Sequence, residues 1–544
     1  MALLAASLLA VTPADAVPLP GHASVSTGSD PSTVQRSETA ARTTTSTTPQ
    51  QTLAAAKALF SASARRRLAA SGVAVPDGRD ASLVLRDLRQ SLDRLSPADR
   101  ATARRILARP TVGGTLVDST LEHNYTVAEE APVCDADRIC VHYVTSTDDA
   151  STLAQAQLTL ATLEDVWDKE VGGLGYKKPL PDGDLVENGG DSRFDVYLQN
   201  LTSPDGALFG YCIPDTDQVT SPGYCVLDND YSPAVYGTAH TPQENLEVTA
   251  AHEFFHAVQF AYDSFEDAWF MEGTAAWMED EVYTTVNDNR VHLPISQMRM
   301  GFFPLDTTVF PGEIFGEPQP VYEPYGSWVF WRYLSESATA SKATASPTIV
   351  RQVWEKAAEA GYYSTKALSA VLRAKGTSFA AKYATFTVWN RDPKKYFQEG
   401  AAYPRSALDK SFVLTARKPS SGGWRIDNND HMSFGVARFT PGTTLTGPRR
   451  LRIAVDMADR SRGSVARVVV HGRGGSATSY AVTLDRLGRG GKTVNFRRST
   501  VANVELIYSN TSTRFTCNRN TQYSCAGTGT DDNRSVNFAA RAIR

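Results

Sequence analysis

The sequence predicts an α+β chain that ends in an all-β domain. Three observations predict this fold class. Helical patterns dominate residues 52–110 and most of residues 281–397, whereas strand-like runs alternate with a helix between residues 111 and 240. From residue 424 to residue 544, short β-branched runs alternate with Gly- and Arg-rich turns, which predicts a small β-sandwich. The Pro-Ser-Gly stretch at residues 419–423 is interpreted as a linker.

The N-terminus has the pattern of an exported protein. An apolar run at residues 2–11 precedes an A-x-A cleavage pattern at residues 14–16, so residues 1–16 are predicted to be a signal peptide. The run is too short to span a bilayer, and we expect no membrane insertion. The Ser-, Thr- and Pro-rich residues 17–51 are predicted to be a disordered linker.

The cysteines and the net charge also indicate a secreted, extracellular protein. Six cysteines fall into three close pairs, which predicts local disulfides in an oxidising compartment. The predicted pairs are Cys134–Cys140, Cys212–Cys225 and Cys517–Cys525. The C-x-x-C spacing of a zinc ribbon is missing. Because the net charge is only −4, there is no general electrostatic case for a nucleic-acid partner.

The motif H-E-F-F-H at residues 252–256 carries the most chemical information. On a helix, His252 and His256 would project from one face and could share a zinc ion. Glu253 follows the first histidine, where the general base for a metal-bound water is expected. The alternative is a pair of hydrogen-bonded core histidines.

The residues before the motif predict a well-started helix. Thr241 can cap it, Pro242 suits its first position, and Glu244 completes a capping box. The chain from Glu244 to Tyr262 has no Gly or Pro and is predicted to form about five helical turns. One stripe of this helix is apolar, and we expect the histidines on a neighbouring face.

Glu272 is the predicted third zinc ligand. It would lie in the first turns of a second helix that starts near residues 264–267. Small residues at positions 273–276 make that helix thin, so it can pack closely on the first. The rival carboxylates, each with a solvated helix face as the alternative, are Glu266, Asp267, Glu279 and Asp280. Glu279 shares a face with Glu272 and could support a metal ligand from behind.

These residues resemble the gluzincin zinc metallopeptidases. The segment 269–275 is similar to their third-ligand segment, and residues 250–280 look most like a little-characterised family of secreted bacterial metalloproteases. The resemblance implies a two-lobed zincin domain over residues 111–418, with a helical C-terminal lobe. It also implies zinc ligation by His252, His256 and Glu272, and catalysis by Glu253.

Departures from the gluzincin motifs narrow the class of peptidase that we expect. The gap between His256 and Glu272 is shorter than in thermolysin or the aminopeptidases, and the absence of a G-A-M-E-N motif favours an endopeptidase. Gln259 and Tyr262 stand where a metzincin has its Gly and third His. The resemblance to aminopeptidase-like gluzincins further implies a tyrosine that stabilises the oxyanion. Our first choice is Tyr325 and our second is Tyr322, and simple packing is the alternative.

Other segments complete the predicted central domain. Its strands are residues 139–144, 193–198 and 223–227, and its first helix is residues 151–171. The last of these strands is expected to border the cleft and to pair with extended substrate. Asp228-Asn229-Asp230 follows it and is interpreted either as a calcium-binding turn or as a plain turn.

The flanking regions are assigned partly by position. Ahead of a secreted hydrolase, residues 52–110 are interpreted as a propeptide that masks the cleft, with processing sites at Arg65–Arg67 and Arg104–Arg105. A small helical surface domain is the alternative. The arginine-rich turns of the C-terminal domain are either solvated or a contact surface for cell-wall polymers and other glycans.

The sequence therefore predicts a secreted zinc endopeptidase that is made as a zymogen and hydrolyses peptide or protein substrates through a metal-activated water, with Glu253 as general base. One alternative is a cell-surface or glycan-binding adhesion protein whose zinc is structural. The other is a zinc hydrolase that acts on a non-protein amide of the cell wall.

Overall fold

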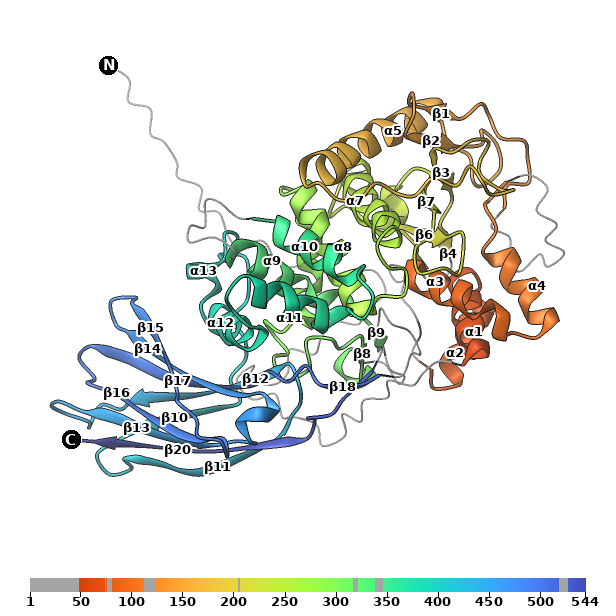
Figure 1. The fold of residues 1–544 in the computed structure, drawn as a ribbon. Coiled ribbons are helices and arrows are strands. Elements are labelled where there is room, and N and C mark those ends of the chain that lie inside the picture. The colour runs from red at the N-terminus through yellow and green to blue at the C-terminus, as the bar shows by residue number, and fades with distance from the viewer. Residues whose placement is uncertain are drawn as a thin grey trace, which may run out of the picture.

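The computed structural model describes residues 48–73, 75, 81–111, 124–203, 206–316, 321–337, 346–517 and 527–544. The predicted signal peptide and most of the predicted linker, residues 1–47, lie outside these ranges. Within them the fold class is α+β, as predicted. Figure 1 shows three parts: N-terminal helices, a central region of helices around a mixed sheet, and a C-terminal pair of β-sheets.

Four helices form the N-terminal block, which we define as residues 48–111. They are α1 (Pro49–Phe60), α2 (Ala62–Ala70), α3 (Ala81–Ser91) and α4 (Pro97–Ile106). The side chains of Thr48, Ser61 and Ser96 cap α1, α2 and α4, which explains where these helices begin. The predicted processing sites therefore lie inside α2 and α4.

The central sheet has the strand order β1-β2-β3-β7-β6. The strands are β1 (Val133–Cys134), β2 (Ile139–His142), β3 (Phe194–Gln199), β6 (Gly210–Pro214) and β7 (Gly223–Asp228). β2, β3 and β7 are parallel, and the outer strands β1 and β6 are antiparallel to them. The expectation that residues 223–227 border the cleft is wrong, because β7 is internal and β6 is the edge strand.

The two faces of this sheet belong to different cores. Alternate residues of a strand point to opposite faces. Cys212 packs with α5 (Leu153–Trp167) and α7 (Pro242–Phe260), whereas its neighbours Tyr211 and Ile213 pack with the N-terminal block. The block therefore shares a hydrophobic core with the sheet and is not a separate surface domain.

The rest of the described chain adds further helices and short strand pairs. The helices are α6 (Pro233–Tyr236), α8 (Ala268–Val282), α9 (Trp328–Ser337), α10 (Thr348–Ala357), α11 (Ser364–Ala374), α12 (Phe379–Arg391) and α13 (Pro393–Tyr396), with a π-helical turn at Asp168–Gly173 and 3-10 turns at Leu92–Arg94, Asp288–Ile295, Gly312–Ile314, Tyr325–Ser327 and Arg460–Arg462. Short strand pairs are β4 (Thr202–Ser203) with β5 (Gly206–Ala207), β8 (Val309–Phe310) with β9 (Val321–Tyr322), and β18 (Phe515–Thr516) with β19 (Thr528–Gly529).

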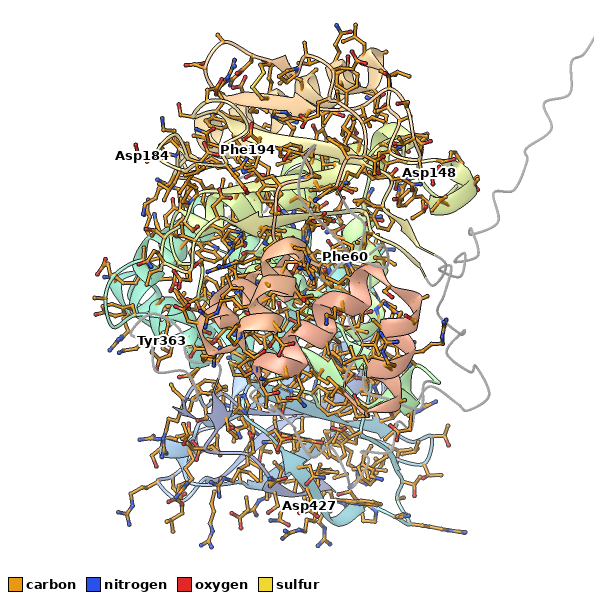
Figure 2. The ribbon with its side chains drawn as sticks, turned by 90° about the vertical axis from the view of Figure 1, so that its right-hand side faces the viewer. Phe60, Asp148, Asp184, Phe194, Tyr363 and Asp427 are labelled. Atoms are coloured by element: carbon orange, nitrogen blue, oxygen red, sulfur yellow. A yellow bond between two sulfur atoms is a disulfide. The ribbon has the colours of Figure 1, made fainter. Side chains whose placement is uncertain are left out.

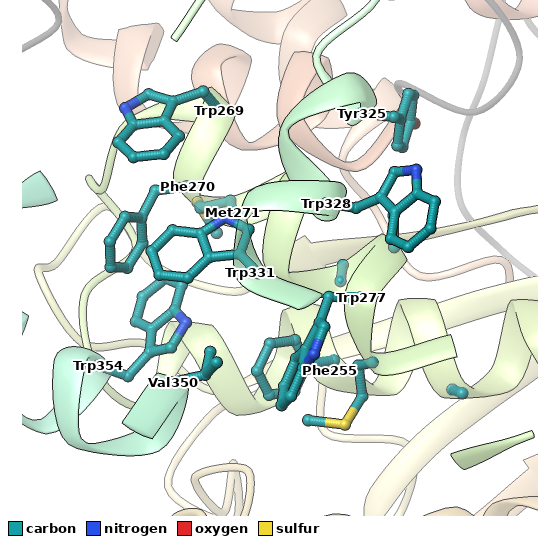
Figure 3. Close-up of a cluster of buried hydrophobic side chains, with 14 of the residues drawn as sticks. Phe255, Trp269, Phe270, Met271, Trp277, Tyr325, Trp328, Trp331, Val350 and Trp354 are labelled. Carbon is teal, nitrogen blue, oxygen red and sulfur yellow. The ribbon is translucent and has the colours of Figure 1, made fainter. Parts of the chain in front are cut away.

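Aromatic side chains fill the space behind α8. Trp269 stacks on Trp331 at 5.6 Å between ring centroids, and Phe270 meets Trp331 and Trp354 edge-on. Figure 3 shows these rings gathered close together. Aromatic pairs of this kind add to the stability that burial supplies, so they hold α8 in one position.

The C-terminal domain is a β-sandwich, as predicted. One sheet has the order β10-β12-β17-β14-β15, and the other has the order β11-β20-β13-β16. Its strands are β10 (Lys410–Leu414), β11 (Ser420–Asn429), β12 (Ser433–Pro441), β13 (Arg450–Asp456), β14 (Ser464–Gly472), β15 (Ala477–Ala481), β16 (Arg489–Asn495), β17 (Val501–Asn510) and β20 (Arg534–Ile543). Phe439 and Phe538 meet between the two sheets.

The boundary of this domain lies earlier than expected. β10 already belongs to the sandwich, and residues 420–423 are part of β11. The Ser- and Gly-rich stretch is therefore not a linker. It forms an irregularity of the register between Ser420 and Gly423, where Gly422 has a φ of 75°.

Figure 2 shows the N-terminal helices across the middle of one side of the molecule, with the central sheet above them and the sandwich below. None of the helices in the described parts of the chain is long and apolar enough to cross a bilayer.

Candidate metal centre

Helix α7 begins as predicted. Thr241 accepts a hydrogen bond from the backbone of Glu244, Glu244 reaches back to Thr241, and Pro242 occupies the first position. Burial is not confined to the apolar stripe, because every residue from Val248 to Phe260 is buried. The helix lies between the sheet and other helices, so all its faces are covered and the motif sits in the interior.

Helix α8 places Glu272 beside the motif. It starts at Ala268, just after the predicted segment 264–267. Gly273 permits a close approach of α8 to a neighbour, but this neighbour is not the predicted one. A Cβ on Gly273 would lie 2.0 Å from Ser327 Oγ, so this glycine serves the contact with the turn before α9 and not the contact with α7.

The three predicted ligands converge. His252 Nε2 lies 3.0 Å and His256 Nε2 lies 3.4 Å from the same oxygen, Glu272 Oε2. One ligand atom from each of the three residues lies within 4.8 Å of the others. Ligands at about 2 Å from a tetrahedral zinc are about 3.3 Å apart, so the spacing fits this metal.

Each histidine is held from behind by a hydrogen bond to its other ring nitrogen. Glu279 Oε1 lies 2.7 Å from His252 Nδ1, and Gln259 Oε1 lies 2.8 Å from His256 Nδ1. Gln259 Nε2 donates to the carbonyl of Met271, which can only accept, and this fixes the orientation of the amide. Both Nδ1 atoms therefore carry a proton, and both Nε2 atoms face Glu272, where each could bind a metal once free of a proton.

This arrangement calls for a cation. Two imidazole Nε2 atoms and a carboxylate oxygen meet in the interior, and such a set is stable only with a positive charge among them, either a proton on a ring nitrogen or a metal ion. Glu272 Oε1 is buried and accepts no hydrogen bond from the described residues. The residues present thus fit a zinc ion with two histidines and one glutamate, a donor set typical of catalytic zinc sites.

The contacts in this group shift the pKa values of His252 and Glu272 in opposite directions. Burial lowers the pKa of His252, but the hydrogen bonds with Glu272 and Glu279 outweigh it and raise that pKa well above its usual value. Burial raises the pKa of Glu272, yet the nearby His256 and His252 lower it to about 2. Both shifts have the same cause, which is the close contact between the histidines and the carboxylates.

Glu253 lies next to this group but points elsewhere. Its Oε2 accepts a 2.7 Å hydrogen bond from Ser82 of α3, and burial raises the pKa of its carboxyl group. A Cβ on Gly210 would come within 3.0 Å of Glu253 Cγ, so the glycine lets the edge strand β6 pass close to it. A small pocket opens here, lined by Phe209, Gly210, Val248, Thr249, His252, Glu253, Glu279, Asp288 and Tyr325.

The structure distinguishes between the two tyrosine candidates. Tyr325 lines the pocket, its ring lies 5.7 Å from the ring of His252, and it stacks on His292 at 4.5 Å. Tyr322 lies in β9 and is not among the residues that line the pocket.

Two of the rival carboxylates are engaged elsewhere. Glu266 accepts a hydrogen bond from the backbone of Ser364, and Asp280 is paired with Arg332. Glu279 has the supporting position that the sequence suggested. Two residues at the site were not predicted. Gln259 was noted only as a departure from the metzincins, although its position three residues after His256 places it on the same helix face. Ser82 lies 171 positions before Glu253, and no local signal reveals it.

Two of the three predicted disulfides lie wholly within the described residues. The disulfides Cys134–Cys140 and Cys212–Cys225 are present. Cys517 is disulfide-bonded, and its predicted partner Cys525 lies outside the described residues.

The turn that was interpreted as a calcium candidate is held by its own hydrogen bonds. The carboxylate of Asp228 accepts from three backbone N–H groups, those of Leu201, Asp230 and Tyr231. This is the pattern of a plain turn.

Comparison with known proteins gives no family. No protein-family model matches the chain, and no curated protein matches it. Among solved structures, a pre-peptidase C-terminal domain of a collagenase from Bacillus anthracis is 7% identical, covers 25% of this chain and 96% of that one, and has a TM-score of 0.15. A family GH115 4-O-methyl-alpha-glucuronidase is 10% identical, covers 68% of this chain and 54% of that one, and has a TM-score of 0.14. Scores this low support no argument about fold or function.

Proposed function

We propose that this protein is a secreted zinc-dependent endopeptidase of gluzincin type. The observation that carries the proposal is the convergence of His252, His256 and Glu272 in one buried site, with both histidines oriented by Gln259 and Glu279. The two disulfides support secretion, since such bonds persist in oxidising compartments. The central region would then be a zincin domain, with α7 between its sheet and its C-terminal helices.

Zinc would bind to His252, His256 and Glu272, and when bound it supplies a Lewis acid and lowers the pKa of a water molecule. Glu253 would take the proton of the attacking water and deliver it to the leaving amine. Burial suits Glu253 to this exchange, because it raises the pKa of its carboxyl group. Tyr325 would donate its hydroxyl to the oxyanion.

An extended substrate would pair with the edge strand β6. An edge strand presents unpaired backbone groups, and β6 passes directly beside Glu253 at Gly210. Strand pairing binds a substrate through hydrogen bonds to its main chain rather than through its side chains. It therefore favours peptide substrates of varied sequence. This feature favours a peptidase over a hydrolase of a non-protein amide.

The substitution Glu253→Gln tests the proposal. The variant should keep its zinc, since Glu253 is not one of the three proposed ligands, and should lose about 10²–10⁴-fold in the rate of casein hydrolysis. Glu247→Gln, in the same helix but away from the site, is the matched control and should behave as wild type. The assay needs protein in which the N-terminal block has been opened, and zinc analysis and the assay use the same samples.

Equal casein hydrolysis by Glu253→Gln and wild type would contradict the peptidase proposal and would favour a structural zinc. Zinc-dependent activity on cell-wall amides, without peptide cleavage, would favour the other alternative. Tyr325→Phe separates the role of the tyrosine, because unchanged turnover would remove Tyr325 from the mechanism.

A further inference from the structure

We infer that helix α3 is an autoinhibitory strap that closes the cleft over Glu253 and the edge strand β6. The inference rests on the proposed function for what the cleft would bind, but the contacts that define the strap are independent of it. They come from three polar residues at helical spacing, Ser82, Arg86 and Gln90. Residues at i, i+4 and i+8 lie on one face of a helix, so one stripe of α3 faces the site.

The first contact blocks two substrate positions with one hydroxyl group. Ser82 Oγ donates to Glu253 Oε2 at 2.7 Å and accepts from the backbone N–H of Cys212 at 2.8 Å. Glu253 is the proposed proton carrier. The Cys212 N–H points away from β7, so it is a group that an extended peptide would use on β6. Ser82 is completely buried between Glu253 and the edge strand.

The second and third contacts join α3 to the segment that precedes α8 and to α8 itself. Arg86 Nη1 donates to the carbonyl of Glu266 at 2.8 Å and contacts Met271 Sδ, next to the ligand Glu272. Gln90 Nε2 donates to the carbonyl of Ser264 at 2.8 Å. The helix therefore bridges the sheet edge and the segment that leads into α8.

The strap is anchored away from the cleft. Arg109 at the end of the N-terminal block is buried among the carboxylates of Asp182, Asp195 and Asp215. Release of the whole block would leave Asp182 and Asp215 without Arg109, would leave Asp195 with His142 alone, and would expose the core that the block shares with the sheet. We therefore infer that activation loosens the polar face of α3 rather than discarding residues 52–110 intact.

Two substitutions in the full-length chain test the strap, with Arg104→Ala on the exposed side of α4 as the control. Ser82→Ala removes both hydrogen bonds at the site, and Arg86→Met keeps the bulk of the side chain but removes its donors. The first measurement is amide hydrogen exchange of β6 in metal-free protein. Ser82→Ala should speed exchange at Cys212 about fivefold, the loss of one ordinary hydrogen bond, whereas Arg104→Ala should not change it.

The second measurement uses cobalt in place of zinc and follows the visible spectrum during titration with a dialanine hydroxamate. Arg86→Met should bind this probe at least about tenfold more tightly than wild type, because the strap that competes with the probe is weakened. Ser82→Ala should shift in the same direction.

The outcomes separate the strap from the proposed function. Equal exchange at β6 and equal hydroxamate affinity in wild type and both variants would overturn the strap. A missing cobalt spectrum would overturn the metal site instead, and the exchange measurement would still decide whether α3 covers β6. Faster exchange with an unchanged hydroxamate affinity would overturn the claim that α3 blocks the cleft.

Discussion

Two buried clusters of this molecule each centre on a glutamate but surround it with different partners. In the candidate metal centre, Glu272 meets the Nε2 atoms of two histidines, whose Nδ1 atoms are hydrogen-bonded on the far side of the ring. Where α12 packs on the sandwich, Glu505 meets donors only. Its oxygens accept from Arg391 at 2.7 Å and from Arg438 at 2.9 Å, and His471 lies at 3.2 Å.

The difference teaches how to recognise a site that needs a ligand. Arginines neutralise Glu505 and hold its pKa well below the usual value despite burial, so this cluster is complete. The cluster at Glu272 has histidines in place of arginines, and no arginine or lysine of the described residues forms an ion pair with that carboxylate. The cluster at Glu505 stabilises the contact between α12 and the sandwich, whereas the cluster at Glu272 is expected to hold a metal.

The largest effect is expected where the complete cluster is broken. Glu505→Ala would leave Arg391 and the partly buried Arg438 without their partner, and a broken buried pair of this kind destabilises by about 3–5 kcal/mol. Native-state hydrogen exchange of α12 would report the loss, while zinc content should not change. A change in zinc content without a loss of stability would reverse the roles assigned to the two clusters.

A smaller effect is expected behind the metal centre. Glu279→Gln keeps a hydrogen-bond acceptor for His252 but removes the charge, and changes of this kind typically weaken metal affinity about 10–100-fold. Competition with a chelator of known affinity measures it, with Glu247→Gln as the control. If Glu279→Gln bound zinc as tightly as wild type, Glu279 would have no supporting role.

The smallest effect concerns a third cluster, which is complete like that of Glu505. Burial lowers the pKa of His142, but hydrogen bonds to Asp195 and Glu129 outweigh it and raise the pKa to about 8. Since the pKa is raised on folding, the stabilisation is fully present below about pH 6.5 and is lost as the pH rises through about 8.

The shift corresponds to about 2 kcal/mol. We therefore expect the destabilisation by His142→Asn, measured by hydrogen exchange of β2, to shrink by about 2 kcal/mol between pH 6 and pH 9. The same destabilisation at both pH values would show that His142 is not charged in the folded protein.

The sequence could predict the local parts of this account. The cap at Thr241, the helical spacing of His252 and His256, and the close cysteine pairs are all set by residues near each other in the chain. Glu272 lies beside the two histidines, as expected, because the second helix follows within a short loop and few geometries were open to it.

The missed parts depend on contacts between distant residues. Ser82 meets Glu253 only because the N-terminal block packs on the outer face of the sheet. β6 is short and borders a glycine, so it lacks a strand pattern of its own, and its edge position depends on the whole strand order. The stretch at residues 419–423 has the composition of a linker, yet neighbouring strands hold it in a sheet.

The zinc content of the purified full-length protein tests the central claim most directly. After dialysis against zinc-free buffer, wild type and Glu505→Ala should each retain one zinc per chain, and His256→Ala should retain little or none, because two ligands seldom hold zinc in a buried site. A wild-type chain that binds no zinc, or a His256→Ala chain that keeps it, would contradict the assignment of His252, His256 and Glu272 as a metal centre.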